Sequence, residues 1–179
     1  MTTSTNLGFT YPTVGADDDT WGTVLNALLL IIDAQHGPKF SATNAAGGAQ
    51  TITTNTLTKV TLGTELYDVG AYFASSKYTP LVAGTYRFFG NATVDGSGGS
   101  LVRQYLGVKK NGTTYYPLSD ANGLSGTGSS GTMSGFVDIA MNGSTDYVEL
   151  WVLAVAAGTV TVTGAAQGLA GFAGYFIKT

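Results

Sequence analysis

The sequence contains no cysteine, a single histidine and few charged residues. Without cysteine the chain can form neither disulfide bonds nor thiolate metal sites. His36 is the only side chain whose ordinary pKa lies near neutrality, which limits the choice of a general base. Charged residues make up 11% of the chain, whereas a typical soluble domain has about 25%. Much of the surface must therefore be covered by neutral side chains or by other subunits.

The basic residues are few and scattered along the chain. Lys and Arg number 8 against 11 Asp and Glu, which gives a net charge of −3. Only Lys109 and Lys110 are adjacent, and Asn111-Gly112 follows them as a hairpin-turn signal. Nucleic-acid binding needs a basic patch that displaces counterions from phosphates. We therefore expect no nucleic-acid partner and interpret the lysine pair as part of a solvated turn.

The chain also lacks a long apolar run and a signal peptide. The apolar run from Leu28 to Ile32 is far shorter than the roughly 20 residues that a membrane-spanning helix needs. Residues 1–8, MTTSTNLG, have neither the basic nor the apolar region of a signal peptide. We expect no membrane insertion, and we expect the chain to be made and folded in a cytoplasm.

No group of residues forms a catalytic or metal-binding pattern. His36 stands beside Gly37-Pro38, where a role at a helix C-terminus is expected. Asp17 to Asp19 lack the alternating spacing of a calcium-binding loop. Glu65 and Glu149 are the only glutamates, and no flanking signature marks them as a glycosidase pair. We expect a protein that is not an enzyme and that has no metal or other cofactor.

Residues 18–36 carry the one convincing helix pattern. Asp17 or Asp18 can cap the first turn, and the negative charge of Asp17 to Asp19 suits the positive end of the helix dipole. Gly37-Pro38 ends the pattern, because proline cannot continue a helix. Apolar residues recur at the three- and four-residue steps of one helical face: Trp21, Val24, Leu25, Leu28, Ile31 and Ile32.

The centre of this expected helix is apolar on nearly all sides, so it must be buried on several sides. Two arrangements are open. The helix can lie across the β-domain that follows, or it can pack against copies of itself or against a partner protein. We favour the second, because a terminal element ahead of a complete β-domain need not belong to that domain's core.

The first fifth of the chain contains a loose pattern of the form N-L-G…P…G…D-x-W-G…L-N…D. It consists of Asn6-Leu7-Gly8, Tyr11-Pro12, Gly15, Asp17 to Asp19, Trp21-Gly22, Leu25-Asn26 and Ile32-Asp33. This pattern resembles a segment at the N-termini of bacteriophage structural proteins, mostly tail-fibre and appendage proteins. The resemblance implies that residues 1–38 form an attachment segment to other virion proteins, with contributions from Tyr11, Pro12, Asp18, Trp21, Leu25, Leu28 and Ile32.

Residues 39–179 have the pattern of a mainly β domain. Short segments rich in β-branched and aromatic residues alternate with Gly-rich turns, which indicates a β-sandwich and most simply a jelly roll. Between Tyr67 and Phe73 we expect a loop entering a strand, and Pro117 is expected to stop the strand that begins at Tyr115. Gln50–Leu62 is expected to form one strand or a pair of strands. The other expected strands are Lys39–Thr43, Gly84–Val94, Leu101–Val108, Met133–Met141, Tyr147–Val155, Thr159–Thr163 and Leu169–Ile177.

The alternation is clearest between Gly84 and Val94. Tyr86 and Phe88 fall on one side of this strand, and Arg87 and Phe89 fall on the other. Because both sides carry aromatic residues, we expect both faces of the strand to be covered.

The β region contains a set of motifs in a characteristic order. They are Phe40-Ser41-Ala42, Lys59-Val60, Tyr67-Asp68-Val69-Gly70, Phe73, Pro80, Gly84 to Phe88, Val108 to Gly112, Asp146 to Leu150 and Phe172 to Ile177. Together they resemble the complement globular-head and tumour-necrosis-factor-like jelly roll over nearly all of residues 39–179. The sequence lacks the collagen-like repeat of the animal members, and it has no Asp-rich calcium site, so calcium is not expected.

This resemblance implies a closed homotrimer. Three-fold self-association would also cover the second face of a strand that is aromatic on both sides. The residues expected at the trimer interface are Tyr86, Phe88, Phe136 and Tyr175. Burial in the core of a single copy remains the alternative for each of them.

Two functions are compatible with these features. The first is a structural virion component: a trimeric fibre, spike or decoration protein, anchored by residues 1–38 and displaying the jelly roll outward. The alternative is an adhesin that binds a polysaccharide of the host surface, with sugar rings stacked on Tyr115, Tyr116 or Trp151 unless these pack within the fold. A secreted bacterial trimer is a third class, which the missing signal peptide disfavours. We expect the protein in the virion.

Overall fold

The computed structural model describes residues 2–3, 10–11, 37–45, 48–97, 101–123, 130–164 and 170–178. Its contacts divide the chain into two units, Met1–Gly37 and Pro38–Thr179. In the first unit, β1 (Thr2–Thr3) and β2 (Thr10–Tyr11) form an antiparallel pair. The helix expected at 18–36 lies outside the described residues. Among the residues that are described, none forms a helix long and apolar enough to cross a membrane.

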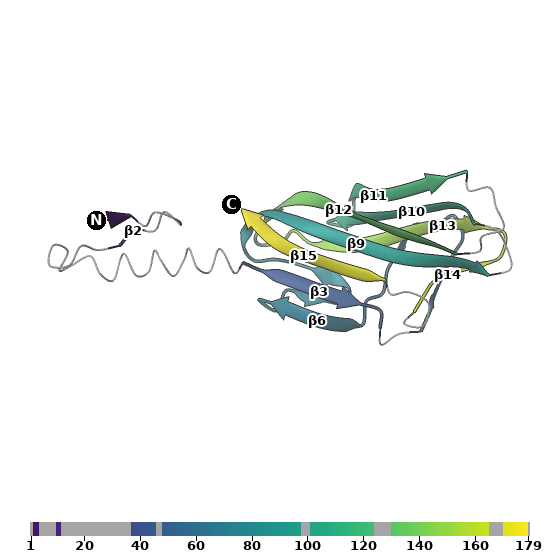
Figure 1. The fold of residues 1–179 in the computed structure, drawn as a ribbon, viewed down its shortest axis with the longest axis horizontal. Helices are drawn as coiled ribbons and strands as arrows, with labels where there is room; N and C mark the ends of the chain where they lie inside the picture. Colours follow the sequence, from purple (N-terminus) through teal and green to yellow (C-terminus); the bar gives the residue numbers. More distant parts are fainter. Residues whose placement is uncertain are drawn as a thin grey trace. The chain divides into compact units, whose positions relative to one another are not determined.

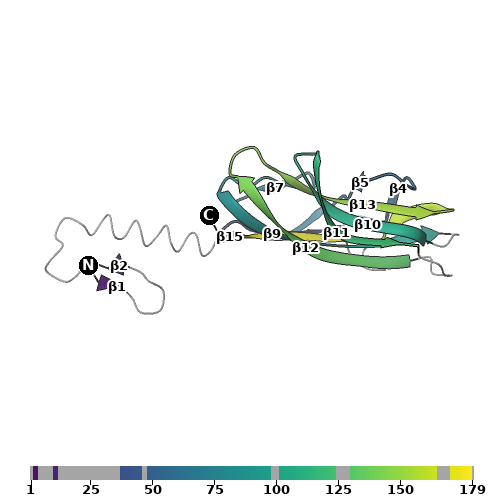
Figure 2. The ribbon, with the colours of Figure 1, turned by 90° about the horizontal axis from the view of Figure 1, so that it is seen from above.

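The second unit contains two antiparallel sheets packed face to face (Figures 1 and 2). The strands of the first sheet are β3 (Lys39–Thr43), β4 (Gln50–Ile52), β6 (Thr64–Val69), β9 (Ala83–Ser97), β12 (Ser130–Asn142), β14 (Thr159–Val162) and β15 (Gly171–Lys178). The strands of the second sheet are β5 (Thr58–Lys59), β7 (Phe73–Ala74), β8 (Lys77–Tyr78), β10 (Leu101–Lys110), β11 (Thr114–Asn122) and β13 (Val148–Ala156).

The long strand β9 organises the first sheet. The order of this sheet is β4-β14-β9-β15-β3-β6, and β12 pairs with β9 along its whole length. The order of the second sheet is β11-β10-β13-β8-β7, with β5 paired to β13. The expectation of a mainly β jelly-roll sandwich is confirmed.

Aromatic rings from both sheets meet in the core. Phe40 of β3 stacks on Tyr78 of β8, with ring centroids 4.1 Å apart, and on Phe73 of β7 at 5.1 Å. Phe88 and Phe172 complete the cluster from neighbouring strands of the first sheet. Burying rings of this size gives about 2–3 kcal/mol per side chain, so this cluster is a main contact between the sheets.

The predicted alternation of β9 is confirmed. Tyr86 and Phe88 are fully buried, whereas the side chain of Phe89 is 41% exposed. A β-strand directs successive side chains to opposite faces of its sheet. The aromatic residues on one side of β9 therefore belong to the core, and those on the other side lie on the outer face of the first sheet.

Two expectations about strands are wrong. Pro117 does not end its strand, because β11 continues to Asn122. β11 lies at the edge of its sheet and has a register shift beside Pro117, and both conditions allow a proline within a strand. Tyr67 lies in the strand β6 rather than in a loop, and Leu66 is the extra residue of a bulge there.

Two hairpin turns have both central residues in the left-handed region, as type I′ turns require. The predicted Asn111-Gly112 turn joins β10 to β11, with φ of 54° and 68°. Ser75 and Ser76 join β7 to β8, with φ of 53° and 58°. Left-handed φ is unfavourable for serine, but the Ser76 hydroxyl bonds both the N–H and the carbonyl of Leu62.

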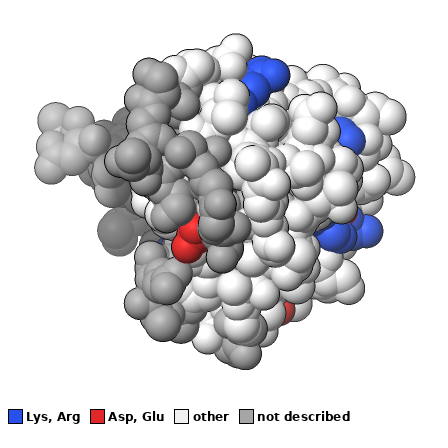
Figure 3. Space-filling model, turned by 90° about the vertical axis from the view of Figure 1, so that its right-hand side faces the viewer, with Lys and Arg blue, Asp and Glu red and all other residues white. Residues whose placement is uncertain are grey.

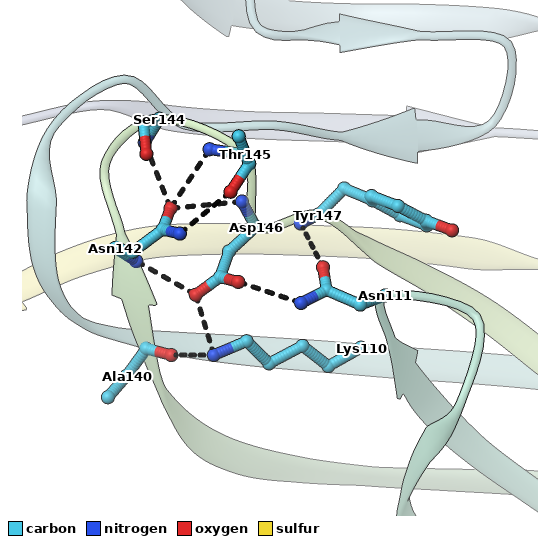
Figure 4. A network of polar contacts seen from close by, with 8 residues as sticks. All are labelled: Lys110, Asn111, Ala140, Asn142, Ser144, Thr145, Asp146 and Tyr147. Atoms are coloured by element: carbon cyan, nitrogen blue, oxygen red, sulfur yellow. Dashed lines mark hydrogen bonds and ion pairs between the residues drawn. The ribbon is translucent and has the colours of Figure 1, made fainter.

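A polar network ties two turns together at one end of the domain (Figure 4). The Asp146 carboxylate accepts hydrogen bonds from Asn111 Nδ2 at 2.7 Å and from the backbone N–H of Asn142 at 2.9 Å. Lys110 Nζ lies 2.7 Å from the same carboxylate and donates to the Ala140 carbonyl. Asp146 thereby joins the β10–β11 hairpin to the β12–β13 connection.

Charged side chains are sparse on the surface of the domain. On the end of the domain shown in Figure 3, basic side chains lie apart from one another on a surface that is mostly neutral. This agrees with the low charged fraction of 11%.

The two serines of the β7–β8 turn should respond differently to glycine. Ser75→Gly relieves a left-handed φ at an exposed position and should stabilise the domain by about 0.5 kcal/mol. Ser76→Gly relieves the same kind of φ but leaves buried backbone groups of Leu62 without partners, so it should destabilise by about 1–2 kcal/mol. Urea unfolding of both variants checks this, and equal effects would contradict it.

Asp146→Asn should destabilise the domain by about 2 kcal/mol, because it removes an ionic partner at a side chain only 11% exposed. Asp120→Asn is the matched control: Asp120 pairs with Arg103 on the surface, and its loss should leave the unfolding midpoint nearly unchanged. If urea unfolding shows a similar loss of unfolding free energy in both variants, the central role of Asp146 is contradicted.

The stabilisation by Asp146 should also depend on pH. Burial alone would raise the pKa of Asp146, but hydrogen bonds from Asn111, Lys110 and Asn142 outweigh it and lower the pKa. The stabilisation is therefore present above the unfolded pKa of about 3.9 and is lost as the pH falls through the lower folded value. Below about pH 4 the difference in the free energy of unfolding between the wild type and Asp146→Asn should therefore become smaller.

Candidate functional site

The outer face of the first sheet carries a row of exposed aromatic side chains, here named the aromatic face. One row of cross-strand partners runs across the sheet and contains Tyr67 of β6, Phe89 of β9 and Phe136 of β12. Residues of β3 and β15 lie between Tyr67 and Phe89 in this row. Tyr175 of β15 lies in the next row. These side chains are 49%, 41%, 59% and 41% exposed, in the order Tyr67, Phe89, Phe136, Tyr175.

The rings of the aromatic face contact one another. Phe89 lies between Phe136 and Tyr175, with centroid distances of 5.9 and 6.0 Å. Val69, which is 42% exposed, extends the apolar surface along β6 in the row of Tyr175. Apolar side chains gathered across several strands in this way are typical of an interaction surface, unlike single exposed apolar residues.

Two of the charges beside these rings are paired with each other, while Lys39 lies in the same row as Tyr175. Arg87 donates two hydrogen bonds of 2.7 Å to the carboxylate of Asp138, and these hydrogen bonds lower the pKa of Asp138. The guanidinium also lies 4.9 Å from the ring centroid of Phe136. Because this pair is already bonded in two places, the aromatic face can be covered without leaving either charge unpartnered.

The residues expected at a trimer interface fall into two groups. Phe136 and Tyr175 lie on the aromatic face, where another subunit can reach them. Tyr86 and Phe88 have no exposed surface, so the alternative of a core position applies to them. Phe89, which lies between Phe136 and Tyr175, was not among the expected interface residues, although the alternation of its strand already placed it opposite Phe88.

The outer face of the second sheet carries a different cluster, here named the Tyr–Trp platform: Tyr105, Tyr115 and Trp151. The three residues surround Gly107, which is opposite Trp151 in the ladder. The Tyr115 ring lies across Gly107, where an added Cβ would be 2.5 Å from ring atoms. Tyr105 stacks on Tyr115 with centroids 5.0 Å apart. Burial raises the pKa of the Tyr115 hydroxyl.

Charged side chains hold Trp151 in place. Its indole N–H donates to Glu149 at 3.2 Å, and the other carboxylate oxygen of Glu149 accepts from Lys59 at 3.2 Å. Glu149 is only 8% exposed, so this arrangement is rigid. The ammonium of Lys109 lies 4.1 Å from the centroid of the Trp151 ring. Across the residues that the structure describes, no carboxylate pairs with Lys109.

The residues expected to contact glycans are partly brought together. Tyr115 and Trp151 share the platform, whereas Tyr116 is opposite Val108 and packs against the core. Tyr105 and Lys109 also belong to this surface and were not expected there. Their position depends on which strands are neighbours, and no local pattern in the sequence contains that information.

Other expected sites lie apart or outside the described residues. Tyr11 takes part in β2, while the rest of the attachment set lies outside: Pro12, Asp18, Trp21, Leu25, Leu28 and Ile32. Glu65 and Glu149 belong to different sheets, so they do not form a carboxylate pair. Within the described ranges, no three His, Asp or Glu side chains gather as a metal site would require. The absence of enzymatic activity stays a prediction.

Comparisons with known proteins give information on the fold. No model of a protein family matches the chain, and no curated protein matches its sequence. The crystal structure of murine APRIL at pH 8.0 has a TM-score of 0.51 and 9% sequence identity, over 76% of this chain and 97% of that chain. The murine APRIL structure at pH 8.5 has a TM-score of 0.44 and 10% identity over the same shares.

At 9% identity the likeness to the first of these structures concerns the fold alone. Residues 38–179 therefore have a jelly-roll fold of the tumour-necrosis-factor-like type.

Proposed function

We propose that the protein is a structural component of a bacteriophage virion, a homotrimeric fibre, spike or decoration protein. Residues 1–38 anchor it to other virion proteins, and the jelly roll is displayed outward. The observation that carries the self-association is the aromatic face, where Phe89, Phe136 and Tyr175 form contacting rings that are each at least 41% exposed.

A second copy of the chain suits the aromatic face better than solvent does. Its rings lie on paired strands of a rigid sheet, so covering them costs little conformational entropy. A stable interface typically has an apolar centre and a polar margin. The aromatic face has this arrangement, with rings at its centre and the Arg87–Asp138 ion pair at its margin. Closed rotational symmetry covers such a face on every copy, and the jelly-roll resemblance favours three copies.

The attachment role rests on the N-terminal segment. Its pattern resembles the attachment end of phage appendage proteins, and contacts separate Met1–Gly37 from the jelly roll as a unit of its own. The same assembly is compatible with the alternative function, an adhesin for a polysaccharide of the host surface.

Light scattering of the full chain and of residues 39–179 should give the mass of a trimer for both. Phe136→Ser combined with Phe89→Ser should reduce the mass to that of a monomer, because it removes the exposed rings at the centre of the face. Val102→Ser is the control: this side chain is 49% exposed on the second sheet, and its loss should leave the trimer intact.

Other masses would contradict parts of the proposal. If only the full chain is trimeric, the N-terminal segment is the trimerisation element and loses its assignment as a free attachment element. If both forms are monomers, the aromatic face does not bind a second copy.

Antibodies raised against residues 39–179 should decorate purified phage particles from cells that carry this gene, as seen by immunogold electron microscopy. Particles assembled with a chain that lacks residues 1–38 should not be decorated, because the jelly roll alone has no anchor. Absence of label from wild-type particles, with the protein present in the lysate, would contradict the virion assignment.

A further inference from the structure

We propose that Trp151 and Lys109 on the Tyr–Trp platform form a binding site for the acidic sugar units of a polysaccharide, with the sugar ring on the indole and its carboxylate on the ammonium. This inference develops the adhesin alternative by naming a ligand class. It depends neither on trimer formation nor on a place in the virion.

Trp151 has the support that a binding residue needs. It lies on β13, a central strand of the second sheet, and β5 and β10 flank it on both sides. The hydrogen bond to Glu149 fixes the rotation of the indole, and the ion pair with Lys59 in turn fixes Glu149. A ring held in this way offers an apolar surface to a ligand without first having to be ordered.

The flexible side chain of Lys109 lies over the ring of Trp151. Its ammonium contacts the indole face by a cation–π interaction, which is weak at an exposed site. The other rings of the platform are covered more firmly. Tyr115 is stacked under Tyr105, and the guanidinium over Tyr105 belongs to Arg103, which Asp120 holds by two hydrogen bonds. Trp151 is therefore the ring that a ligand can uncover by moving a single flexible side chain.

The charges of the platform favour an acidic ligand. Both carboxylates on this face are already paired, Glu149 with Lys59 and Asp120 with Arg103. Lys109 has no carboxylate partner among the described residues. A ligand carboxylate would supply a charge-assisted hydrogen bond in place of the weaker contact with the ring. A neutral sugar would displace the same lysine and offer it only hydroxyl oxygens, which accept weaker hydrogen bonds from an ammonium than a carboxylate does.

Single-stranded nucleic acid also combines stacking bases with negative charge. It fits this surface less well, because it requires a basic groove that follows several phosphates, and the chain carries a net charge of −3. A thymidine oligomer therefore serves as the competing probe.

The experiment is isothermal titration calorimetry of the full chain with an oligogalacturonate of defined length. The same oligomer with methyl-esterified carboxylates is the neutral control. We expect the acidic oligomer to bind at least about tenfold more tightly than the ester and to weaken as sodium chloride is raised. The thymidine oligomer should bind more weakly than the acidic sugar.

Two variants test the two halves of the site. Trp151→Ala should abolish binding of the acidic oligomer. Lys109→Glu places a like charge against the ligand, so it should also abolish binding. Because residue 109 is opposite Glu149 in the ladder, the unfolding midpoint of this variant is measured as well, and binding is tested where the variant is folded. Lys77→Glu is the matched control, because Lys77 also lies over an aromatic ring, that of Tyr147 at 4.7 Å. Its binding should equal that of the wild type.

Several results would overturn the proposal. The first is that the acidic oligomer does not bind the folded wild type. The second is that the acid and its ester bind with equal affinity. The third is that Lys109→Glu and Lys77→Glu lose the same amount of affinity for the acidic oligomer. Tighter binding of the thymidine oligomer would replace the sugar with a nucleic acid. If Trp151→Ala unfolds, the decision rests on Lys109→Glu and on the comparison of acid with ester.

Discussion

The alternation of aromatic residues along β9 is the constraint on which the rest of the structure depends. Successive side chains of a strand point to opposite faces, and a two-layer sandwich can bury only one of these faces. Phe88 enters the core and meets the ring of Phe40, which in turn stacks on Tyr78 of the opposite sheet. Phe89, the next residue, is left on the outside between two further rings. The residue pattern that closes the sandwich thus also creates an apolar outer face.

The scarcity of charge has a second consequence. The described ion pairs join strands or turns to their neighbours: Lys59–Glu149, Arg87–Asp138, Arg103–Asp120 and Lys110–Asp146. The paired charges each join neighbouring elements, and much of the surface between them is neutral. Lys109 on the platform has no carboxylate partner among the described residues, which is also true of Lys39 and Lys77. The ammonium of Lys109 lies instead against the ring of Trp151.

More of the fold could be predicted from the sequence than of the aromatic face and the Tyr–Trp platform. Period-two alternation and turn residues such as Asn111-Gly112 identified most strands, because these signals are local. Pro117 was misjudged because its tolerance depends on β11 being an edge strand, which is a property of the sheet order. Tyr115 and Trp151 of the platform were expected to bind a ligand, but their meeting at one place was not predicted, for the same reason. Tyr115 and Trp151 lie far apart in the sequence and become neighbours of Gly107 only through the pairing of β10 with β11 and β13.

The two surfaces lie on different sheets, and this separation allows them to act together. Self-association through the outer face of the first sheet leaves the outer face of the second sheet open to solvent. Each copy in a closed assembly then presents its own Trp151 and Lys109. A polysaccharide repeats the same sugar unit along its length, so sites on several copies can engage one polymer, and weak binding at each site adds up to firm attachment. The proposed assembly and the proposed adhesion are therefore compatible, because each would use a different side of the sandwich.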